Sequence, residues 1–256
     1  MSIRSFGRRS GWIVIALLMI AAVIYFFGSP LNSNPWGTVA SSAVAQPIGD
    51  LPNMPYKPQP QGITFDGCPP QGEGGDSELN FLKNRVDVGS YVPVSFDSIT
   101  ALTWPKTAER SNMKDWSSSA RAYIAQYEGI PVMVEGYIVN VREADPEPAN
   151  CNRLNGSNLS WHISFTKNPR DARSQAIIAE ATPRIRYNHP WTFDLMHSAI
   201  IDNHVQVRIS GWLFFNPDHP GDVGQTRATL WEIQPVMQIE VSQNGRWVPL
   251  DKFATK

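Results

Sequence analysis

The order of its strand-like segments constrains the fold of this chain most strongly. Runs rich in β-branched and aromatic residues, bounded by turn residues, lie at residues 132–143, 159–166, 175–181, 205–215 and 229–241. In the second run, Leu159, Trp161 and Ile163 alternate with polar residues, which predicts a strand with one apolar and one polar face. Pro190 near the start of residues 189–201 favours a short helix there. The predicted order is therefore three strands, a helix and two strands.

This order is that of the OB-fold, a five-stranded Greek-key barrel with its helix between strands three and four. Gly136 and Gly211 lie inside the first and fourth predicted strands, where barrel closure needs sharp bends. Pro235 predicts a bulge in the last strand. We therefore expect a mainly β protein with an OB-like barrel over residues 130–243. A β-sandwich and an open α+β sheet are the alternatives.

Two further segments flank the predicted barrel. Residues 107–128 carry apolar side chains at helical spacing and are followed by Gly129 and Pro131, which predicts one helix before the first strand. We assign residues 77–129 to an extension that packs on the barrel through apolar residues such as Leu79. Residues 244–256 are expected to form a C-terminal tail.

The amino terminus carries a membrane signal. Residues 11–28 form an uncharged apolar run, close to the ~20 residues that a spanning helix needs. Arginines precede this run, and the next Lys or Arg is Lys57, so the positive-inside rule places residues 1–10 in the cytoplasm and the rest outside. We expect a single-pass protein of the bacterial inner membrane with a periplasmic domain. A signal sequence cleaved after Ala43-Val44-Ala45 is the alternative.

Composition bounds what the rest of the chain can do. Residues 29–76 are rich in Pro, Gly and Ser, which predicts a linker between the anchor and the domain. The chain carries 22 Lys and Arg against 23 Asp and Glu, which excludes a polybasic protein that coats nucleic acid. Its two cysteines exclude a disulfide-dense scaffold. Outside the cytoplasm Cys68 and Cys151 can pair; free thiols and a pairing between chains are the alternatives.

Candidate chemistry is sparse. The chain has no Gly-x-Ser-x-Gly elbow, no Gly-rich phosphate loop and no histidine pair at zincin spacing, so we expect no cofactor, no metal and no catalytic residue. A ligand site is expected on the face of the second and third strands. The residues predicted to line it are His162, Arg170, Arg173, Glu180, Arg184 and Arg186.

Two other functions remain open at this point. Arginines near the second and third strands permit binding of single-stranded nucleic acid or an oligosaccharide, although Glu143, Asp145 and Glu147 in the loop after the first strand would repel phosphate. A metal-dependent hydrolase would use His162, Glu180 and His219.

The chain also resembles a family through short motifs spread over residues 67–241. They are Gly74-Gly75-Asp76, Leu79-Asn80, Leu82-Lys83-Asn84-Arg85, Trp161-His162-Ile163, Glu180-Ala181-Thr182-Pro183-Arg184, His189-Pro190, Gly211-Trp212, Asp218-His219-Pro220 and Trp231-Glu232-Ile233. Together they resemble an uncharacterised family of bacterial membrane-anchored or secreted proteins. The resemblance implies an OB-like domain and little established chemistry. Where that family usually has a histidine this chain has Gln234, so no metal or catalytic role is carried over to this position.

The sequence thus predicts a membrane-anchored envelope protein whose domain binds or supports another envelope component. An envelope protein is the expected partner, nucleic acid is not favoured, and enzymatic activity is not expected.

Overall fold

The computed structural model describes residues 49–253. The expected membrane segment, the alternative cleavage site at Ala43-Val44-Ala45 and the first part of the expected linker lie outside these residues. Within the described part of the chain, none of the helices has the length and apolar character that crossing a membrane requires.

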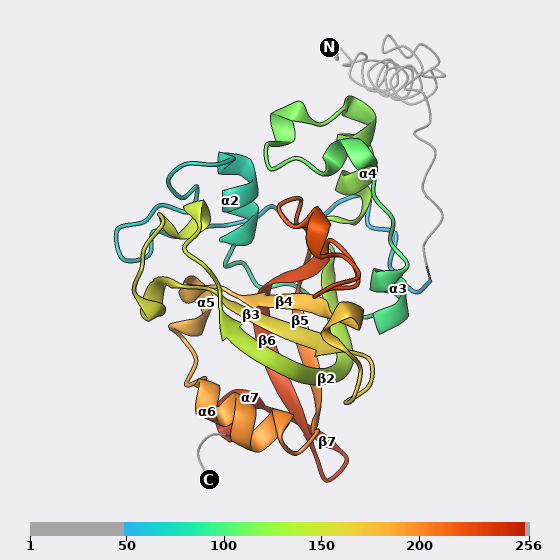
Figure 1. Cartoon of the computed structure of the whole chain (residues 1–256), viewed down its shortest axis with the longest axis vertical. Coiled ribbons are helices and arrows are strands. Elements are labelled where there is room, and N and C mark those ends of the chain that lie inside the picture. Colours follow the sequence, from blue (N-terminus) through green and yellow to red (C-terminus); the bar gives the residue numbers. More distant parts are fainter. Residues whose placement is uncertain (1–48, 254–256) are drawn as a thin grey trace, which may run out of the picture. The chain divides into compact units, whose positions relative to one another are not determined.

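The domain is mainly β and is built on a closed five-stranded barrel (Figure 1). Its strands are β2 (Pro131–Glu143), β3 (Trp161–Thr166), β4 (Ile177–Ala181), β5 (Gln206–Phe215) and β6 (Trp231–Gln243). Neighbours follow the order β2, β3, β4, β6 and β5, and β5 returns to pair with β2. The β4–β6 pair is parallel and the other barrel pairs are antiparallel. This closure and order are consistent with an OB-like barrel, whereas the open sheet considered above is excluded.

Close backbone contacts explain the glycine in the fourth barrel strand. A Cβ on Gly211 would lie 2.4 Å from the Pro235 carbonyl oxygen of β6. Gly211 pairs with Val236 and Leu213 pairs with Ile233, so β6 holds an extra residue at this point, next to the cis peptide bond before Pro235. The bulge predicted at Pro235 is therefore confirmed.

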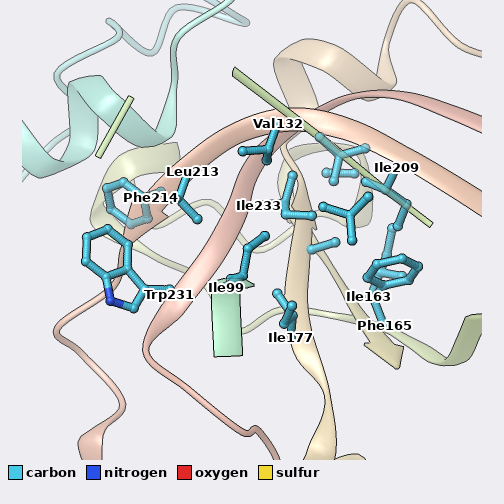
Figure 2. Packing of buried hydrophobic residues seen from close by; sticks show 14 of the residues in the cluster. Ile99, Val132, Ile163, Phe165, Ile177, Ile209, Leu213, Phe214, Trp231 and Ile233 are labelled. Atoms are coloured by element: carbon cyan, nitrogen blue, oxygen red, sulfur yellow. The ribbon is translucent and has the colours of Figure 1, made fainter. Parts of the chain in front are cut away.

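The barrel interior is filled by the apolar faces of the strands (Figure 2). Ile163, Phe165, Ile177, Ile209 and Ile233 are all fully buried there. Alternation along each strand sends these side chains inward and their neighbours outward.

The helical segments differ in part from expectation. Between β4 and β5 lie α5 (Pro183–Arg186), α6 (Phe193–Leu195) and a π-helical turn, η6 (Met196–Ile201), so the helix predicted at 189–201 begins only at Phe193. The single helix predicted over 107–128 is wrong in its first half, which holds two 3₁₀ turns, η1 (Lys106–Ala108) and η2 (Met113–Asp115), before α4 (Ser118–Tyr127). Ser117 starts α4 by accepting a hydrogen bond from the Ala120 amide, and Asn112 likewise caps η2. These local side-chain caps compete with a continuous helix.

Further strands and helices precede and follow the barrel strands in the sequence. Before it come α2 (Ser77–Lys83), β1 (Val92–Pro93), which pairs with β2, and α3 (Phe96–Thr100). Inside the loops are the 3₁₀ turns η3 (Pro148–Asn150), η4 (Gly156–Asn158), η5 (Arg173–Gln175) and η7 (Pro220–Asp222). After it come β7 (Arg246–Pro249), which pairs with β6, and α7 (Leu250–Phe253), so most of the expected tail is folded.

The described part of the expected linker, residues 49–76, also packs on the domain. Leu51 and Cys68 are each only 2% exposed. Leu79 on α2 is buried as predicted. Side chains of this N-terminal segment are therefore buried in the folded domain.

Candidate ligand-binding cleft

A row of polar side chains crosses the outside of the barrel. Arg142 on β2 stands opposite His162 on β3, and His162 stands opposite Glu180 on β4. Because Ile163 and Ala179 beside them are buried in the core, alternation turns the polar row outward. On the polar face predicted for the strand at 159–166, the side chain of His162 thus contacts that of Glu180.

His162 is held by both ring nitrogens. Its Nε2 lies 3.0 Å from Glu180 Oε2, and Arg142 donates to its Nδ1 over 2.9 Å. Burial lowers the pKa of His162, but the charge and the hydrogen bond of Glu180 outweigh it, so this pKa lies above its ordinary value. Burial raises the pKa of Glu180, but His162 and Lys83 lower it more, to about 2. Glu180 is therefore an ionised carboxylate.

Lys83 joins two loops above this row. It ends α2, is 7% exposed, and lies with its Nζ 3.3 Å from Glu147 Oε2 and 3.4 Å from Asp218 Oδ2. Glu147 belongs to the β2–β3 loop and Asp218 follows β5. Burial lowers the pKa of Lys83, but Glu147, Glu180 and the neighbouring carboxylates raise it above its usual value. Lys83 is therefore a buried ammonium that ties α2 to both loops.

These residues enclose a cleft of about 290 Å³. Its floor is His162 and Glu180, and its sides come from α2, the β2–β3 loop and the β5–β6 loop. The lining side chains are of two kinds. The polar ones include Asp76, Asn80, Lys83, Ser111, Arg142, Asp145, Glu147, His162, Glu180, Asn216, Asp218 and His219, and the apolar ones are Leu79, Ala144, Pro146 and Pro148.

Several buried polar atoms at this face have no hydrogen-bond partner among residues 49–253. They are Glu180 Oε1, Glu232 Oε2 and both side-chain polar atoms of Gln234. All three residues are 1% exposed or less. Glu232 Oε1 is satisfied by Asn216 and Arg227. Buried polar atoms are nearly always hydrogen-bonded. Of these three residues Glu180 lines the cleft, so its Oε1 is the atom there that water or a ligand can satisfy.

The predicted arginines do not line the cleft. Arg184 is 1% exposed and donates to Asn84 Oδ1 at 2.8 Å and to Asn150 Oδ1 at 3.0 Å, as well as to the carbonyl groups of Ile63, Cys68 and Pro69. Arg186 donates to backbone carbonyls of Gly156 and Leu159 and lies over the Trp161 ring. Arg170 and Arg173 are exposed in the β3–β4 connection. Of the six predicted site residues, the structure brings together His162 and Glu180.

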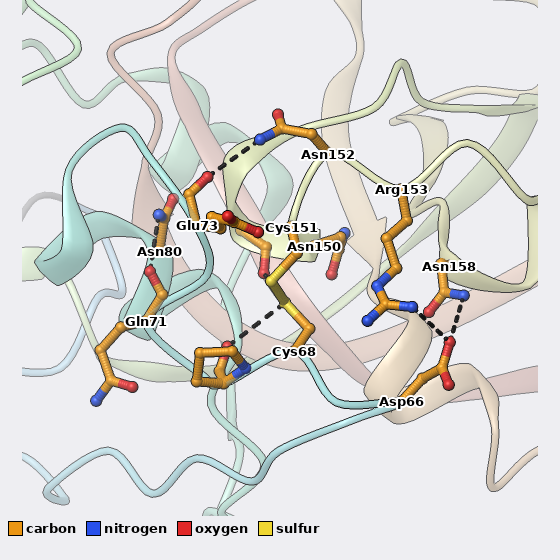
Figure 3. Close-up of a disulfide and its surroundings, with 12 residues drawn as sticks. Asp66, Cys68, Gln71, Glu73, Asn80, Asn150, Cys151, Asn152, Arg153 and Asn158 are labelled. Atoms are coloured by element: carbon orange, nitrogen blue, oxygen red, sulfur yellow. Dashed lines mark hydrogen bonds and ion pairs between the residues drawn. A yellow bond between two sulfur atoms is a disulfide. The ribbon is translucent and has the colours of Figure 1, made fainter.

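The Cys68–Cys151 disulfide is present, as the sequence permitted (Figure 3). It connects the N-terminal segment to the β2–β3 loop. Ion pairing of Arg153 with Asp66 at 3.1 Å and donation by Asn152 to the Glu73 carbonyl at 3.1 Å join the same two segments. The loop that carries Glu147 is thus fixed against the segment that leads into α2.

The three residues of the hydrolase hypothesis are only partly assembled. The rings of His162 and His219 have centroids 6.4 Å apart, and His219 Nδ1 faces Asp222 Oδ2 at 3.4 Å. Within residues 49–253, the histidine, cysteine and acidic side chains form no group of three or more that could hold a metal ion.

Sequence reasoning missed Lys83, Arg142 and Glu147 as cleft residues. Arg142 had a usable signal, because it lies on the polar side of a strand whose neighbour carries His162. Lys83 lies in the Leu82-Lys83-Asn84-Arg85 motif, for which docking on the barrel was expected rather than a place in a ligand site. Glu147 had no signal, and both residues reach the cleft through the way the extension and the loop fold over the barrel.

Comparison of the chain with family models, with curated proteins and with solved structures gave no match. Function must therefore be argued from the cleft itself.

Proposed function

We propose that this chain is a membrane-anchored, extracytoplasmic binding module of the bacterial envelope, and that its OB-like barrel binds a ligand in the cleft over β3 and β4. OB-like barrels bind ligands on the face of their second and third strands, between the loop after strand one and the loop before strand five. In this chain those parts are β3, β4, the loop with Glu147 and the loop with Asp218. The cleft lies among these parts.

The observation that carries the proposal is the free oxygen of Glu180. This carboxylate is 1% exposed, lines the cleft, and has Oε1 without a partner among the described residues. Leaving a buried polar atom unsatisfied costs about 1–3 kcal/mol, and more for a charged group. A ligand that donates to Oε1 would recover this energy.

Binding is favoured over acid–base catalysis by the state of His162. Arg142 Nη2 lies 2.9 Å from one ring nitrogen and Glu180 Oε2 lies 3.0 Å from the other, so both nitrogens already contact groups of the protein. The His162 ring therefore serves as a fixed part of the cleft wall.

One sequence feature and one structural feature support the proposed location. The apolar run at residues 11–28, with arginines before it, favours a single-pass anchor with the domain outside the cytoplasm. The Cys68–Cys151 disulfide is typical of an oxidising compartment.

Site-specific photocrosslinking in the cells that make the protein tests this proposal. A photoreactive amino acid at Asp145, an exposed rim residue, is expected to yield a discrete adduct of the full chain. Ser111→Trp, which places a large side chain at the exposed rim, should abolish that adduct. The same photoreactive group at exposed Asp202, outside the cleft, serves as the control. Equal adducts from both positions, or an adduct that Ser111→Trp leaves intact, would contradict binding in the cleft.

A further inference from the structure

The charge of the cleft limits its ligand. Five carboxylates line it (Asp76, Asp145, Glu147, Glu180 and Asp218), whereas Lys83 and Arg142 are its two lysine and arginine side chains. The acidic groups thus exceed these cationic ones by 5 − 2 = 3, or by 5 − 3 = 2 when His162, whose pKa is raised, is protonated. Walls of low dielectric focus such a field and attract the opposite charge. A phosphate or carboxylate ligand is therefore disfavoured, and a cation is favoured.

Hydrogen-bond use points the same way. The cationic groups are engaged within the protein, because Lys83 contacts Glu147 and Asp218 while Arg142 donates to His162 and to the Glu143 carbonyl. Among the described residues, Glu180 Oε1 has no hydrogen-bond partner, and the Asp145 carboxylate at the rim makes no hydrogen bond or ion pair. Carboxylates accept and cannot donate when ionised, so the ligand must supply N–H or O–H donors.

Two features separate an ammonium ion on an aliphatic stem from other cations. The cleft is about 290 Å³, near the lower end of ligand sites, and Leu79, Ala144, Pro146 and Pro148 supply apolar lining. An alkyl chain can contact these apolar groups while its charged end reaches the carboxylates. A bare metal ion is disfavoured, since residues 49–253 provide no group of three His, Cys or acidic side chains arranged to hold one.

We infer that the cleft binds a primary ammonium group on an aliphatic stem, as a lysine-type side chain carries, with Glu180 as its buried acceptor. This inference rests on the proposed binding function and names the ligand class for the same cleft. Asp145 at the rim and Glu180 at the floor attract the ammonium group, and the stem packs against Leu79 and Pro148.

The test uses the full chain in detergent micelles with ¹⁵N-labelled histidine, so that His162 and His219 report on the cleft. The probe is Nα-acetyl-lysine methylamide. The matched control is the same molecule with its ε-amine acetylated, which keeps the stem and removes the charge. N-acetylglucosamine and Nα-acetyl-glutamate represent neutral and anionic ligands. We expect the lysine derivative alone to shift the His162 and His219 resonances in a saturable way, while His189, His197 and His204 stay unchanged.

Variants extend the test to named carboxylates. Glu180→Gln should weaken the lysine derivative about tenfold or more, because it replaces a charge-assisted hydrogen bond with a neutral one. Asp145→Asn, at an exposed position that does not threaten folding, should weaken it by a smaller factor. Asp202→Asn removes an exposed carboxylate outside the cleft and should leave affinity unchanged.

The outcomes separate this inference from the function it rests on. Equal shifts from the lysine derivative and its acetylated form would overturn the ammonium assignment. Shifts from the neutral sugar or the glutamate derivative, without any from lysine, would overturn the ligand class and leave cleft binding standing. If none of the probes shifts His162 or His219 at about 10 mM, a range in which even weak ligands bind, the ligand class is overturned and the proposed function loses its support.

Discussion

The pairing of His162 with Glu180 is the residue-scale contact with the clearest pH signature. The pKa of His162 is raised from 6.5, so its contribution to the free energy of unfolding is fully present below pH 6.5 and is lost as the pH rises through the folded-state value. The pKa of Glu180 is lowered from 4.5 to about 2, so its contribution is present above pH 4.5 and is lost as the pH falls toward 2. The pair should therefore stabilise the fold most between about pH 4.5 and 6.5.

Glu180→Gln tests this pair directly. The change removes the charge that opposes the burial of His162, so the pKa of His162 should fall. Histidine NMR titration measures that pKa, and urea unfolding at several pH values measures the loss of stability. The difference from the wild type should be largest between pH 4.5 and 6.5. Asp202→Asn is the matched control, and an unchanged His162 titration in Glu180→Gln would show that the two groups do not interact.

Arg184 is a residue-scale contact with a structural role. Its guanidinium donates to two asparagine side chains and three backbone carbonyls in a nearly water-free site. Arg184→Ala leaves these acceptors unsatisfied, and we expect a loss of about 3–5 kcal/mol in the free energy of unfolding. Urea denaturation measures it. Arg170→Ala removes the same side chain from an exposed position and should change stability by less than about 0.5 kcal/mol. Similar losses in both variants would refute the structural role of Arg184.

At the scale of elements, the close approach of β5 and β6 gives the next prediction. A Cβ on Gly211 would meet the Pro235 carbonyl oxygen at 2.4 Å and Ile233 Cγ2 at 2.7 Å. Gly211→Ala should therefore lower the free energy of unfolding by about 1–3 kcal/mol, as overpacking does. Gly221→Ala is the control, because a Cβ added at Gly221 would meet nothing within 4 Å. Thermal unfolding of both variants tests this prediction. Equal melting temperatures would contradict the predicted overpacking at Gly211.

The Cys68–Cys151 disulfide links two elements covalently, the N-terminal segment and the β2–β3 loop. It closes a loop with a sequence separation of 83. The double variant Cys68→Ser with Cys151→Ser should lose about 2–4 kcal/mol of stability, a typical value for such cross-links. Hydrogen exchange should rise in residues 62–86 before it rises in the barrel strands. If hydrogen exchange in the double variant rises equally in residues 62–86 and in the barrel strands, the disulfide is not what holds the N-terminal segment in place.

Much of the element order could be predicted from the sequence, because alternation and turn residues act locally. The barrel strands lie close to their predicted positions, and Pro235 marks a bulge. The prediction of one helix over 107–128 was wrong because side-chain caps at Asn112 and Ser117 divide this segment. The spacing of apolar residues does not reveal such caps. For the cleft, strand alternation brought out His162. Lys83 and Glu147 reach it from distant segments, so only tertiary packing could show them.

At the scale of the whole molecule, charge decides between a nucleic-acid ligand and a cationic one. The chain has a net charge of −1, and the cleft is lined by more carboxylates than lysine and arginine side chains. Arg184 and Arg186, on which phosphate binding would depend, are committed to carbonyl and amide oxygens inside the protein. Within residues 49–253, these two arginines are therefore not available over β3 and β4 to contact a phosphate backbone.

We therefore expect no salt-sensitive binding of nucleic acid. Fluorescence anisotropy of a labelled single-stranded oligonucleotide, titrated with the full chain in detergent micelles, should stay flat at low and at physiological salt. A protein that neutralises several phosphates would instead lose affinity steeply as salt increases. Arg170→Ala with Arg173→Ala is the informative variant, because these arginines are exposed. Tight binding that this double variant weakens would contradict the prediction that nucleic acid does not bind. It would also locate a phosphate site on the β3–β4 connection, away from the cleft.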